Sequence, residues 1–400
     1  MNIFKKFYSR AYQFAFKCML PILPYREPEI LKSNEEIVFL LKQKNIESVL
    51  LVTDKGIRNL GLTKALEEAI VKAEINLSVY DGTVPNPTTD NVAEALDMYY
   101  KNHCNAIIAF GGGSAMDCAK ATGARVVRPK KSLNKMKGVL KVRKKLPLLI
   151  AIPTTAGTGS ETTLAAVITD SVTRHKYAIN DFPLIPKYAA LMPELTLGLP
   201  KFVTATTGMD ALTHAVEAYI GRSTTKQTRT YAREAVKAIF ENVLEVYNNG
   251  SNLKARENML TASYKAGVAF TKSYVGYVHA VAHSLGGKYN VAHGLANAVI
   301  LPYVLRKYGK SIYKKLWELG VYSGLFDKST PKEVGAKIFI EKIEELNSQM
   351  NIGTSISEIK EEDIGELART AEKEANPLYP VPKMFTATEL EQVYRDVKRG

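Results

Sequence analysis

The sequence predicts an N-terminal α/β domain with a parallel sheet, followed by an all-helical C-terminal domain. Short apolar runs alternate with helical stretches before residue 200, and runs of about five residues are typical of strands buried on both faces of a parallel sheet. Beyond Pro200 the apolar residues follow helical spacing and β-branched clusters become rare. The 400 residues are enough for two domains. Pro193, Gly198 and Pro200 mark the boundary between them.

The elements can be placed in order along the chain. Strands are expected at 48–53, 76–80, 106–110 and 148–152. Helices between these strands are expected at 65–72, 91–101 and 115–122. In the second half, helical spacing covers 206–219, 228–247, 253–270 and 333–347.

The positive charge of the chain is concentrated in two segments. Four bases and no acid lie between Lys5 and Lys17, and eleven bases and no acid lie between Lys120 and Lys145. Together they exceed the net charge of +14, so the rest of the chain is close to neutral. Base-stacking aromatics and a nucleic-acid recognition motif are missing around 130–145, so we expect no nucleic-acid partner.

The number and spacing of the cysteines indicate the redox state of the compartment. Cys18, Cys104 and Cys118 are an odd number and lie far apart. This excludes a disulfide framework and a four-cysteine zinc site, and it fits a reducing compartment, so we expect a cytoplasmic protein. No apolar run approaches the roughly 20 residues of a membrane-spanning helix.

Two loops rich in small residues follow predicted strands. Gly-Gly-Gly-Ser at 111–114 precedes a helical stretch, and Pro-Thr-Thr-Ala-Gly-Thr-Gly-Ser-Glu occupies 153–161. Glycines let the backbone approach a phosphate, and a helix N-terminus offers free N–H groups. Two such loops at the carboxyl ends of parallel strands would border one ligand crevice. The glycine loop does not match G-x-G-x-x-G, so a plain strand-to-helix turn is its alternative interpretation.

Two carboxylates lie near these loops. Asp54 ends the first strand, where it would accept hydrogen bonds from an adenosine ribose and repel a 2′-phosphate. Its alternative role is to cap the helix after Gly56. Asp117 follows Ser114 by three residues, and its alternative role is to complement the helix dipole.

Four of the six histidines lie in the helical half. Asp210 and His214 are four residues apart, as are His279 and His283, and His293 follows ten residues later. Imidazole and carboxylate ligands suit Zn²⁺ or Fe²⁺, whereas the lack of nearby cysteine argues against a zinc–sulfur site. The spacing leaves open which three histidines bind. Ala280 excludes H-E-x-x-H, and Glu217 is either a partner of a ligand or an exposed carboxylate.

These motifs, in this order, resemble the iron-containing (group III) alcohol dehydrogenases, a family that includes lactaldehyde reductase, propanediol oxidoreductase and butanol dehydrogenase. The resemblance rests on the glycine loop through Asp117, the threonine loop, Asp210-x3-His214, and His279-x3-His283-x9-His293, and it covers about residues 30–395. It implies a dinucleotide-binding domain at 26–199 and a helical metal-binding domain at 200–400. The implied activity is metal-dependent hydride transfer between a small primary alcohol or aldehyde and NAD(H).

The resemblance also implies roles for individual residues. The expected metal ligands are Asp210, His214, His279 and His293, holding Fe²⁺ with Zn²⁺ as the alternative. His283 would lie near the nicotinamide as a catalytic residue, and Phe270 would line the substrate pocket. Expected cofactor contacts are Asp54, Asn86, Gly112, Gly113, Ser114, Asp117, Thr154, Thr155, Thr158 and Lys176. Asp54 matches the acidic position associated with a preference for NAD.

Residues 1–25 are additional to the usual beginning of the family, near Glu29. An apolar stripe at helical spacing is formed by Phe4, Phe7, Tyr8, Ala11, Tyr12, Ala15, Cys18 and Met19. A cleaved signal peptide is not expected, because Lys17 interrupts the apolar stretch and no small-residue cleavage site follows. We expect the stripe to pack on its own domain or on a neighbouring subunit of a homo-oligomer. Contact of residues 1–24 with a membrane surface is the alternative.

The motifs fit other functions less well than they fit a dehydrogenase. A polyol (glycerol-type) dehydrogenase or a dehydroquinate synthase-like enzyme would share the fold, but the histidine spacing and the Asp210-x3-His214 start favour the alcohol dehydrogenase branch. A scaffold without activity is disfavoured by the complete ligand set.

Overall fold

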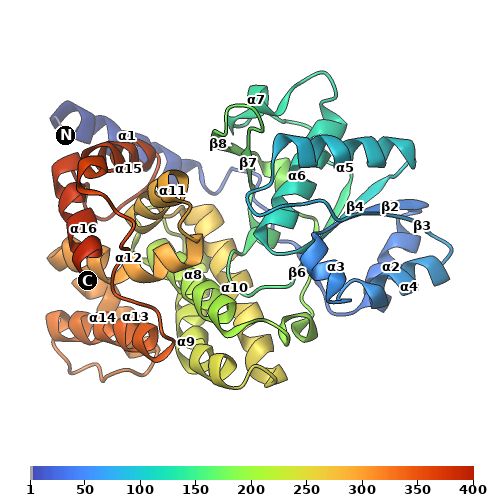
Figure 1. Cartoon of the computed structure of the whole chain (residues 1–400). Coiled ribbons are helices and arrows are strands. Elements are labelled where there is room, and N and C mark those ends of the chain that lie inside the picture. The colour runs from blue at the N-terminus through green and yellow to red at the C-terminus, as the bar shows by residue number, and fades with distance from the viewer. Residues whose placement is uncertain (1–2) are drawn as a thin grey trace. The chain divides into compact units, whose positions relative to one another are not determined.

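The computed structural model describes residues 3–400, which form two compact units (Figure 1). One unit is Pro24–Leu197, and the other combines Gly198–Gly400 with the N-terminal segment up to Leu23. The N-terminal segment therefore does not stand apart but packs with the helical half of the chain.

The unit Pro24–Leu197 is built on a six-stranded sheet in which every pairing is parallel, in the order β1-β9-β6-β4-β2-β3. Its strands are β1 (Glu29–Leu31), β2 (Ser48–Val52), β3 (Asn76–Tyr80), β4 (Ala106–Gly111), β6 (Leu148–Pro153) and β9 (Tyr188–Ala190). The four predicted strands are β2, β3, β4 and β6. Strands β1 and β9 have three residues each, too short to give a hydrophobic pattern.

Both faces of this sheet are covered, which explains the uninterrupted apolar strands. Leu50 and Val52 of β2 face one core, together with residues of α5 (Thr89–Lys101) and α6 (Gly113–Val127). Val49 and Leu51 face the other core, with residues of α2 (Asn34–Gln43) and α4 (Lys64–Lys72).

Shorter elements complete this unit. A second sheet has the order β5-β8-β7, from β5 (Gly138–Val139), β7 (Ala165–Thr169) and β8 (Lys176–Asn180). Short helices are α3 (Lys55–Asn59), α7 (Leu133–Met136), and the 3₁₀ turns Ser160–Thr162, Phe182–Leu184 and Pro193–Thr196.

In the described chain from Gly198 onward, every regular element is a helix. These are α8 (Lys201–Ile220), α9 (Lys226–Asn248), α10 (Leu253–Ser273), α11 (Tyr277–Tyr289), α12 (His293–Tyr308), α13 (Tyr313–Tyr322), α14 (Lys332–Gln349), α15 (Ile364–Ala375) and α16 (Ala387–Arg399), with 3₁₀ turns at Gly309–Ser311 and Glu361–Asp363. Helix α8 is buried along nearly its whole length and packs against α9, α10 and α12, which makes it the centre of this unit.

The N-terminal helix α1 (Ile3–Met19) corrects one expectation. Its buried residues are polar, Ser9 and Gln13, followed by Leu20 just beyond the helix. The aromatic residues of the stripe are exposed instead, so the stripe does not pack on its own domain, and packing on a neighbouring subunit stays a prediction. Among the described residues, no helix is long and apolar enough to cross a membrane.

Candidate metal centre and cofactor loops

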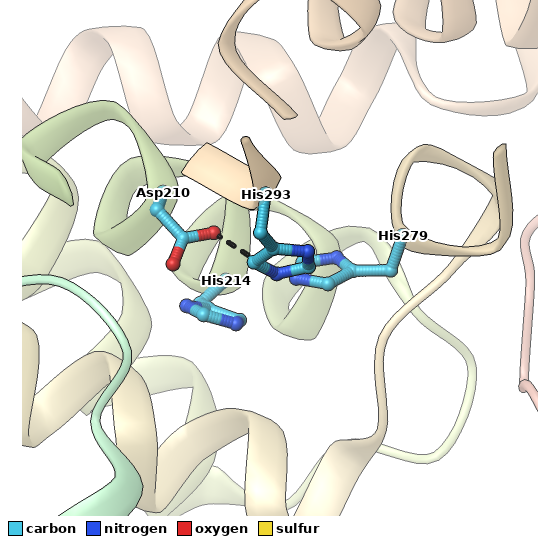
Figure 2. A group of neighbouring side chains, drawn as sticks. All are labelled: Asp210, His214, His279 and His293. Atoms are coloured by element: carbon cyan, nitrogen blue, oxygen red, sulfur yellow. Dashed lines mark ion pairs between the residues drawn. The ribbon is translucent and has the colours of Figure 1, made fainter. Parts of the chain in front are cut away.

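Four predicted ligand residues come together in the helical unit (Figure 2). Helix α8 presents Asp210 and His214 one turn apart, α11 contributes His279, and His293 opens α12. One ligand atom from each residue lies within 4.8 Å of the corresponding atoms of the other three. Asp210, His214 and His279 are buried, whereas His293 is partly exposed. Of the four side chains, His293 is therefore the one most exposed to solvent.

The imidazoles are held by ring contacts. The rings of His214 and His279 stack with their centroids 4.6 Å apart. The His214 ring also stacks on the ring of Phe270 in α10, with the centroids 4.1 Å apart and an interplanar angle of 12°. Phe270, expected in the substrate pocket, thus lies directly beside the group of ligand residues.

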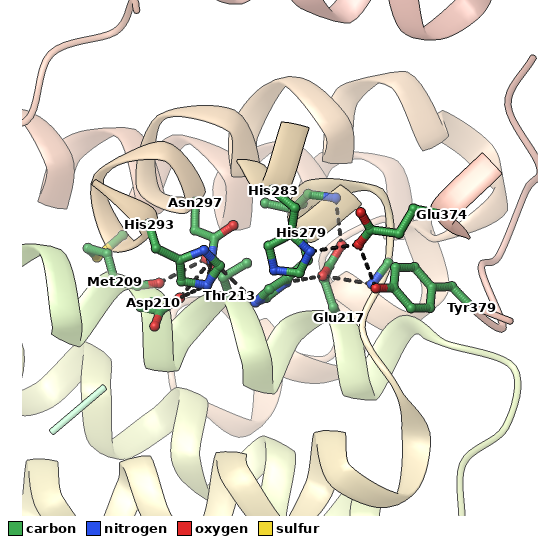
Figure 3. Close-up of polar contacts among 12 residues, drawn as sticks. Met209, Asp210, Thr213, Glu217, His279, His283, His293, Asn297, Glu374 and Tyr379 are labelled. Carbon is green, nitrogen blue, oxygen red and sulfur yellow. Dashed lines mark hydrogen bonds and ion pairs between the residues drawn. The ribbon is translucent and has the colours of Figure 1, made fainter. Parts of the chain in front are cut away.

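Glu217 is a buried neighbour of this group and contacts His279 (Figure 3). Its carboxylate accepts hydrogen bonds from the backbone N–H of Gly276 at 2.8 Å and of Val278 at 2.9 Å, and lies 2.6 Å from His279 Nδ1. The alternative of an exposed carboxylate is therefore wrong. A side chain at Gly276 is excluded, because its Cβ would lie 2.6 Å from Glu217 Oε1.

The electrostatics of this pair determine the tautomer of His279. Burial raises the pKa of Glu217 to about 7, although its backbone hydrogen bonds act against the shift. Burial also lowers the pKa of His279 well below its ordinary value, so the imidazole is neutral. Because the carboxylate is an acceptor, His279 Nδ1–H donates to it, and the lone pair of Nε2 points towards the ligand group.

Asn297 is a member of the site that was not expected from the sequence. It lies one turn after His293 on α12 and is fully buried. Its amide nitrogen donates to Asp210 Oδ1 at 2.7 Å and lies 3.2 Å from His279 Nε2 and 3.1 Å from His293 Nε2 (Figure 3). Polar atoms of three ligand residues thus lie around one amide nitrogen. The only sequence signal is the four-residue spacing from His293.

The donor atoms and their protonation show whether these residues fit a metal ion. Three imidazoles and one carboxylate form a donor set that suits divalent iron or zinc. At least one imidazole is neutral with its lone pair directed inward, as metal binding requires. The donor set therefore fits the metal implied by the resemblance.

His283 lies outside the ligand group, although it is one turn from His279. Its Nδ1 is 2.6 Å from Glu374 Oε1 on α15, and the Tyr379 hydroxyl donates to the same oxygen at 2.8 Å (Figure 3). Burial by itself would raise the pKa of Glu374, but the charge and hydrogen bond of His283, together with Tyr379, lower it below the ordinary value. Glu374 and Tyr379 belong to no motif and lie far along the chain, so the sequence alone does not reveal them.

The segment that carries Tyr379 is held by α1. The Gln13 amide nitrogen donates to the carbonyls of Pro377 at 3.2 Å and Tyr379 at 2.7 Å. The Arg10 guanidinium donates to the carbonyls of Val381 at 2.7 Å and Pro382 at 3.0 Å. A chain of contacts therefore leads from α1 through the segment 377–382 to Glu374 and His283.

The two predicted cofactor loops adjoin each other in the unit Pro24–Leu197. Strands β4 and β6 pair directly, with Gly111 opposite Pro153, and Thr154 N–H donates to the Gly111 carbonyl at 3.1 Å. Gly112 is the N-cap of α6, and a Cβ at Gly113 would lie 3.2 Å from Thr158 Cγ2. The threonine loop thus covers the N-terminus of α6, where Ser114 stands in the first turn and Thr155 lies against Gly112.

The remaining predicted cofactor residues already have protein partners. Asp54 is the N-cap of α3, which begins at Lys55, and its Oδ1 accepts from Ile57 N–H at 2.9 Å. Lys176 donates to Asn86 Oδ1 at 2.7 Å. Asp117 accepts from Ser160 Oγ at 3.1 Å and from Val167 N–H at 3.0 Å, so it ties α6 to the threonine loop and β7.

Lys120 belongs by sequence to the basic segment 120–145 but does not lie at the surface. It is fully buried, so it is not part of the charged segment that ends at Lys145. Its ammonium group lies within 3.1 Å of oxygen atoms of Ser160, Thr163 and Ala165. Burial lowers the pKa of Lys120 to about 8, against the opposing charge of Asp117. Lys120 therefore fastens the end of the threonine loop.

Comparison with known proteins agrees with this architecture. Residues 32–193 match the description "Iron-containing alcohol dehydrogenase", and residues 204–397 match "Fe-containing alcohol dehydrogenase family, C-terminal". The 1,3-propanediol dehydrogenase of Citrobacter freundii is 36% identical over 384 residues, covering 95% of this chain and 98% of that protein. The NAD-dependent methanol dehydrogenase of Bacillus methanolicus is 34% identical, covering 90% and 95%.

The fold agrees equally well with a solved structure. The crystal structure of a 1,3-propanediol oxidoreductase superposes with a TM-score of 0.89 at 33% identity, covering 93% of this chain and 98% of that one. Both halves of the chain match the same family, in the order that the motifs predict. The chain therefore belongs to the iron-containing alcohol dehydrogenase family.

Proposed function

We propose that the protein is an iron-dependent, NAD-dependent alcohol dehydrogenase that interconverts a small primary alcohol and its aldehyde. The observation that carries the proposal is the convergence of Asp210, His279 and His293 on one point, with His214 stacked between His279 and Phe270. Asp210, His214, His279 and His293 would hold Fe²⁺, which would supply Lewis-acid polarisation of a substrate oxygen, and the bound nicotinamide would supply the hydride chemistry.

The ligand residues are oriented in advance by their neighbours. Glu217 holds the Nδ1–H of His279, so that Nε2 keeps its lone pair towards the ligand group. Asn297 holds one oxygen of the Asp210 carboxylate. Phe270 contributes an apolar wall next to His214, which would exclude water from one side of a small substrate.

His283 is the proposed proton-transfer residue. Glu374 fixes its Nδ1 at 2.6 Å, so Nε2 is the atom at which a proton would be gained or lost. The side chain is 43% exposed, which permits exchange of that proton with solvent. His279, at 3% exposure, lacks this access to solvent.

The proposed cofactor site combines the N-terminus of α6 with the threonine loop. Gly112, Gly113 and Ser114 would hold the pyrophosphate at the helix N-terminus, and Thr154, Thr155 and Thr158 would add contacts from the adjoining loop. Asn86 and Lys176 would act as one hydrogen-bonded pair, and Asp117 would act by holding Ser160. Asp54 would accept from the adenosine ribose with the carboxylate oxygen that does not cap α3.

The proposal is tested by a screen of alcohols and aldehydes on protein reconstituted without oxygen, with Fe²⁺ and separately with Zn²⁺. We expect oxidation of short primary alcohols with Fe²⁺ and at least about tenfold preference for NAD over NADP, because Asp54 repels a 2′-phosphate. Asp54→Gly should narrow that preference. Activity confined to polyols, or a preference for NADPH in the wild-type protein, would contradict the proposal.

We also propose that the enzyme acts in the cytoplasm as a homo-oligomer. None of its three cysteines is disulfide-bonded, and Cys104 and Cys118 are buried as thiols, which fits a reducing compartment. Sedimentation velocity of the purified protein and fractionation of cells test both points.

A further inference from the structure

The outer face of α1 is apolar over its whole width. Around a helix with 3.6 residues per turn, the side chains of this face span about 180° without a charged or polar residue. In order around the helix they are Phe14, Phe7, Cys18, Ala11, Phe4, Ala15, Tyr8, Met19 and Tyr12. All of them are exposed, and Phe7 and Phe14 are 77% and 69% exposed. Exposed apolar patches of this size on a folded protein mark an interaction site.

The helix is fixed in this orientation by its inner face. Ser9 and Gln13 are buried, and Gln13 and Arg10 donate four hydrogen bonds to carbonyls of the segment 377–382. Phe16, at the edge of this inner face, packs on Tyr274 with ring centroids 5.0 Å apart. Turning the aromatic face inward would break all these contacts. The apolar face is therefore held outward by specific hydrogen bonds.

Positive charge borders the apolar face. Lys5 lies at one border, and Lys17 lies beyond Arg10 on the other side, both of them exposed. Lys6 is also exposed but lies on the opposite side of the helix. No acidic residue precedes Glu27 in the sequence. Lys315 interacts electrostatically with Lys17, and Arg222 with Arg10, so both add positive charge near α1, where Glu318 supplies an opposing negative charge.

This charge pattern distinguishes between two occupants of the face. In a symmetric pair of copies, the same patch would meet itself, and lysines without any acidic partner would be brought together. An anionic lipid surface offers both an apolar phase for the aromatics and negative headgroups for the lysines. We propose that α1 lies in the interface of an anionic membrane, with its aromatic face among the acyl chains and Lys5 and Lys17 among the headgroups.

Flotation with lipid vesicles tests the proposal on the full-length protein. We expect the protein to float with vesicles of phosphatidylcholine and phosphatidylglycerol at low salt, and to bind at least about tenfold more weakly to phosphatidylcholine alone. Phe7→Ser with Phe14→Ser should weaken binding to anionic vesicles by at least about tenfold, because two large apolar side chains are lost. Lys5→Glu with Lys17→Glu should remove the dependence on anionic lipid.

Two matched controls separate this effect from unfolding and from general stickiness. Val172→Ser replaces an isolated apolar residue that is 90% exposed in the other unit, and it should bind vesicles as the wild type does. The Phe7/Phe14 variant should keep the wild-type melting temperature and turnover, because both side chains are exposed and lie outside the catalytic group. The proposal thus stands or falls independently of the dehydrogenase activity.

Cys18 offers a second measurement at native sequence. It lies within the apolar face and is the exposed thiol of the three, since Cys104 and Cys118 are buried. An environment-sensitive fluorophore on Cys18 should shift to shorter wavelength with anionic vesicles. Failure of the protein to float with anionic vesicles at low salt would overturn the proposal. So would a loss of oligomer mass in the Phe7/Phe14 variant without vesicle binding by the wild type, which would assign the face to a second copy.

Discussion

Two histidines one helical turn apart on α11 each lie beside a glutamate of another helix, yet the two carboxylate–histidine pairs differ in burial. In both, an Nδ1 atom lies 2.6 Å from a glutamate oxygen: His279 with Glu217, and His283 with Glu374. The side chains of the first pair are 3% and 1% exposed, whereas those of the second are 43% and 29% exposed. The two pairs therefore have equal Nδ1–oxygen distances but differ in exposure to solvent.

Burial determines which chemistry such a carboxylate–histidine pair can perform. Desolvation favours neutral forms, so it raises the pKa of Glu217 to about 7 and lowers that of His279. The buried pair is thus suited to orient a fixed ligand. In the more exposed pair, burial raises the pKa of Glu374, but the charge and hydrogen bond of His283 and the hydrogen bond of Tyr379 together outweigh it, so the pKa is lowered. That pair is suited to carry a proton.

The largest expected effect comes from breaking the buried pair. Glu217→Ala leaves the N–H groups of Gly276, Val278 and His279 without their acceptor, and we expect a loss of about 3–5 kcal/mol in the free energy of unfolding. Metal affinity should fall by about 10- to 100-fold. Urea unfolding and metal analysis measure both. Full metal content with unchanged stability would show that Glu217 does not orient His279.

Replacing each of the two histidines by alanine in turn separates their roles more directly. We expect His279→Ala to lose the metal and all measurable turnover, because it removes a ligand. His283→Ala should keep the metal and lose turnover only. Metal content and kcat are measured on the same preparations. Metal loss in His283→Ala would mean that the four-residue pair binds as a unit, and the distinction between the two pairs would be wrong.

The exposed pair is tested by Glu374→Gln, which keeps the shape and removes the charge. We expect kcat to fall about tenfold, equivalent to about 1.4 kcal/mol, with the metal retained. The pH profile of kcat should also shift, and Glu374→Asp should restore part of the rate. Glu366→Gln is a matched control on the same helix, since Glu366 contacts only Lys288 among the ion pairs described. Equal losses in the two variants would argue against a specific role for Glu374.

A smaller effect is expected from α1. Gln13→Ala removes the amide that holds the carbonyls of Pro377 and Tyr379, so the segment that supports Glu374 becomes looser. We expect a decrease in kcat of about threefold or less and faster amide hydrogen exchange over residues 376–383. Phe7→Ser, on the exposed face of the same helix, should change neither measurement.

The smallest effect is a difference in pH dependence of stability in the metal-free protein. Glu374 has a lowered pKa, so the folded state binds fewer protons than the unfolded state below pH of about 5. Its stabilising contribution is full above that pH and disappears as the pH falls through the lowered pKa. Glu217, with a pKa raised to about 7, gives the opposite slope: stability decreases as the pH rises towards 7. Unfolding of Glu374→Gln and Glu217→Gln across this range should show slopes of opposite sign relative to the wild type.

Much of the fold and the ligand set could be predicted from local patterns. Strands β2, β4 and β6 are covered on both faces and so are apolar throughout, which makes them readable without any structure. Asp210 and His214 share a helix, and their four-residue spacing places them on one face of it.

Only the tertiary structure decided which partner each group meets. His279 and His283 have the same spacing pattern, but α8 brings Glu217 to one and α15 brings Glu374 to the other, from 62 and 91 residues away. Lys120 belongs by sequence to a basic segment, yet the threonine loop supplies enough oxygen atoms to bury it. Helical spacing likewise determined that α1 is amphipathic. The carbonyls of the distant segment 377–382 decided that its polar face docks and its aromatic face points outward, because unsatisfied carbonyls bind Arg10 and Gln13 and cannot bind phenylalanine.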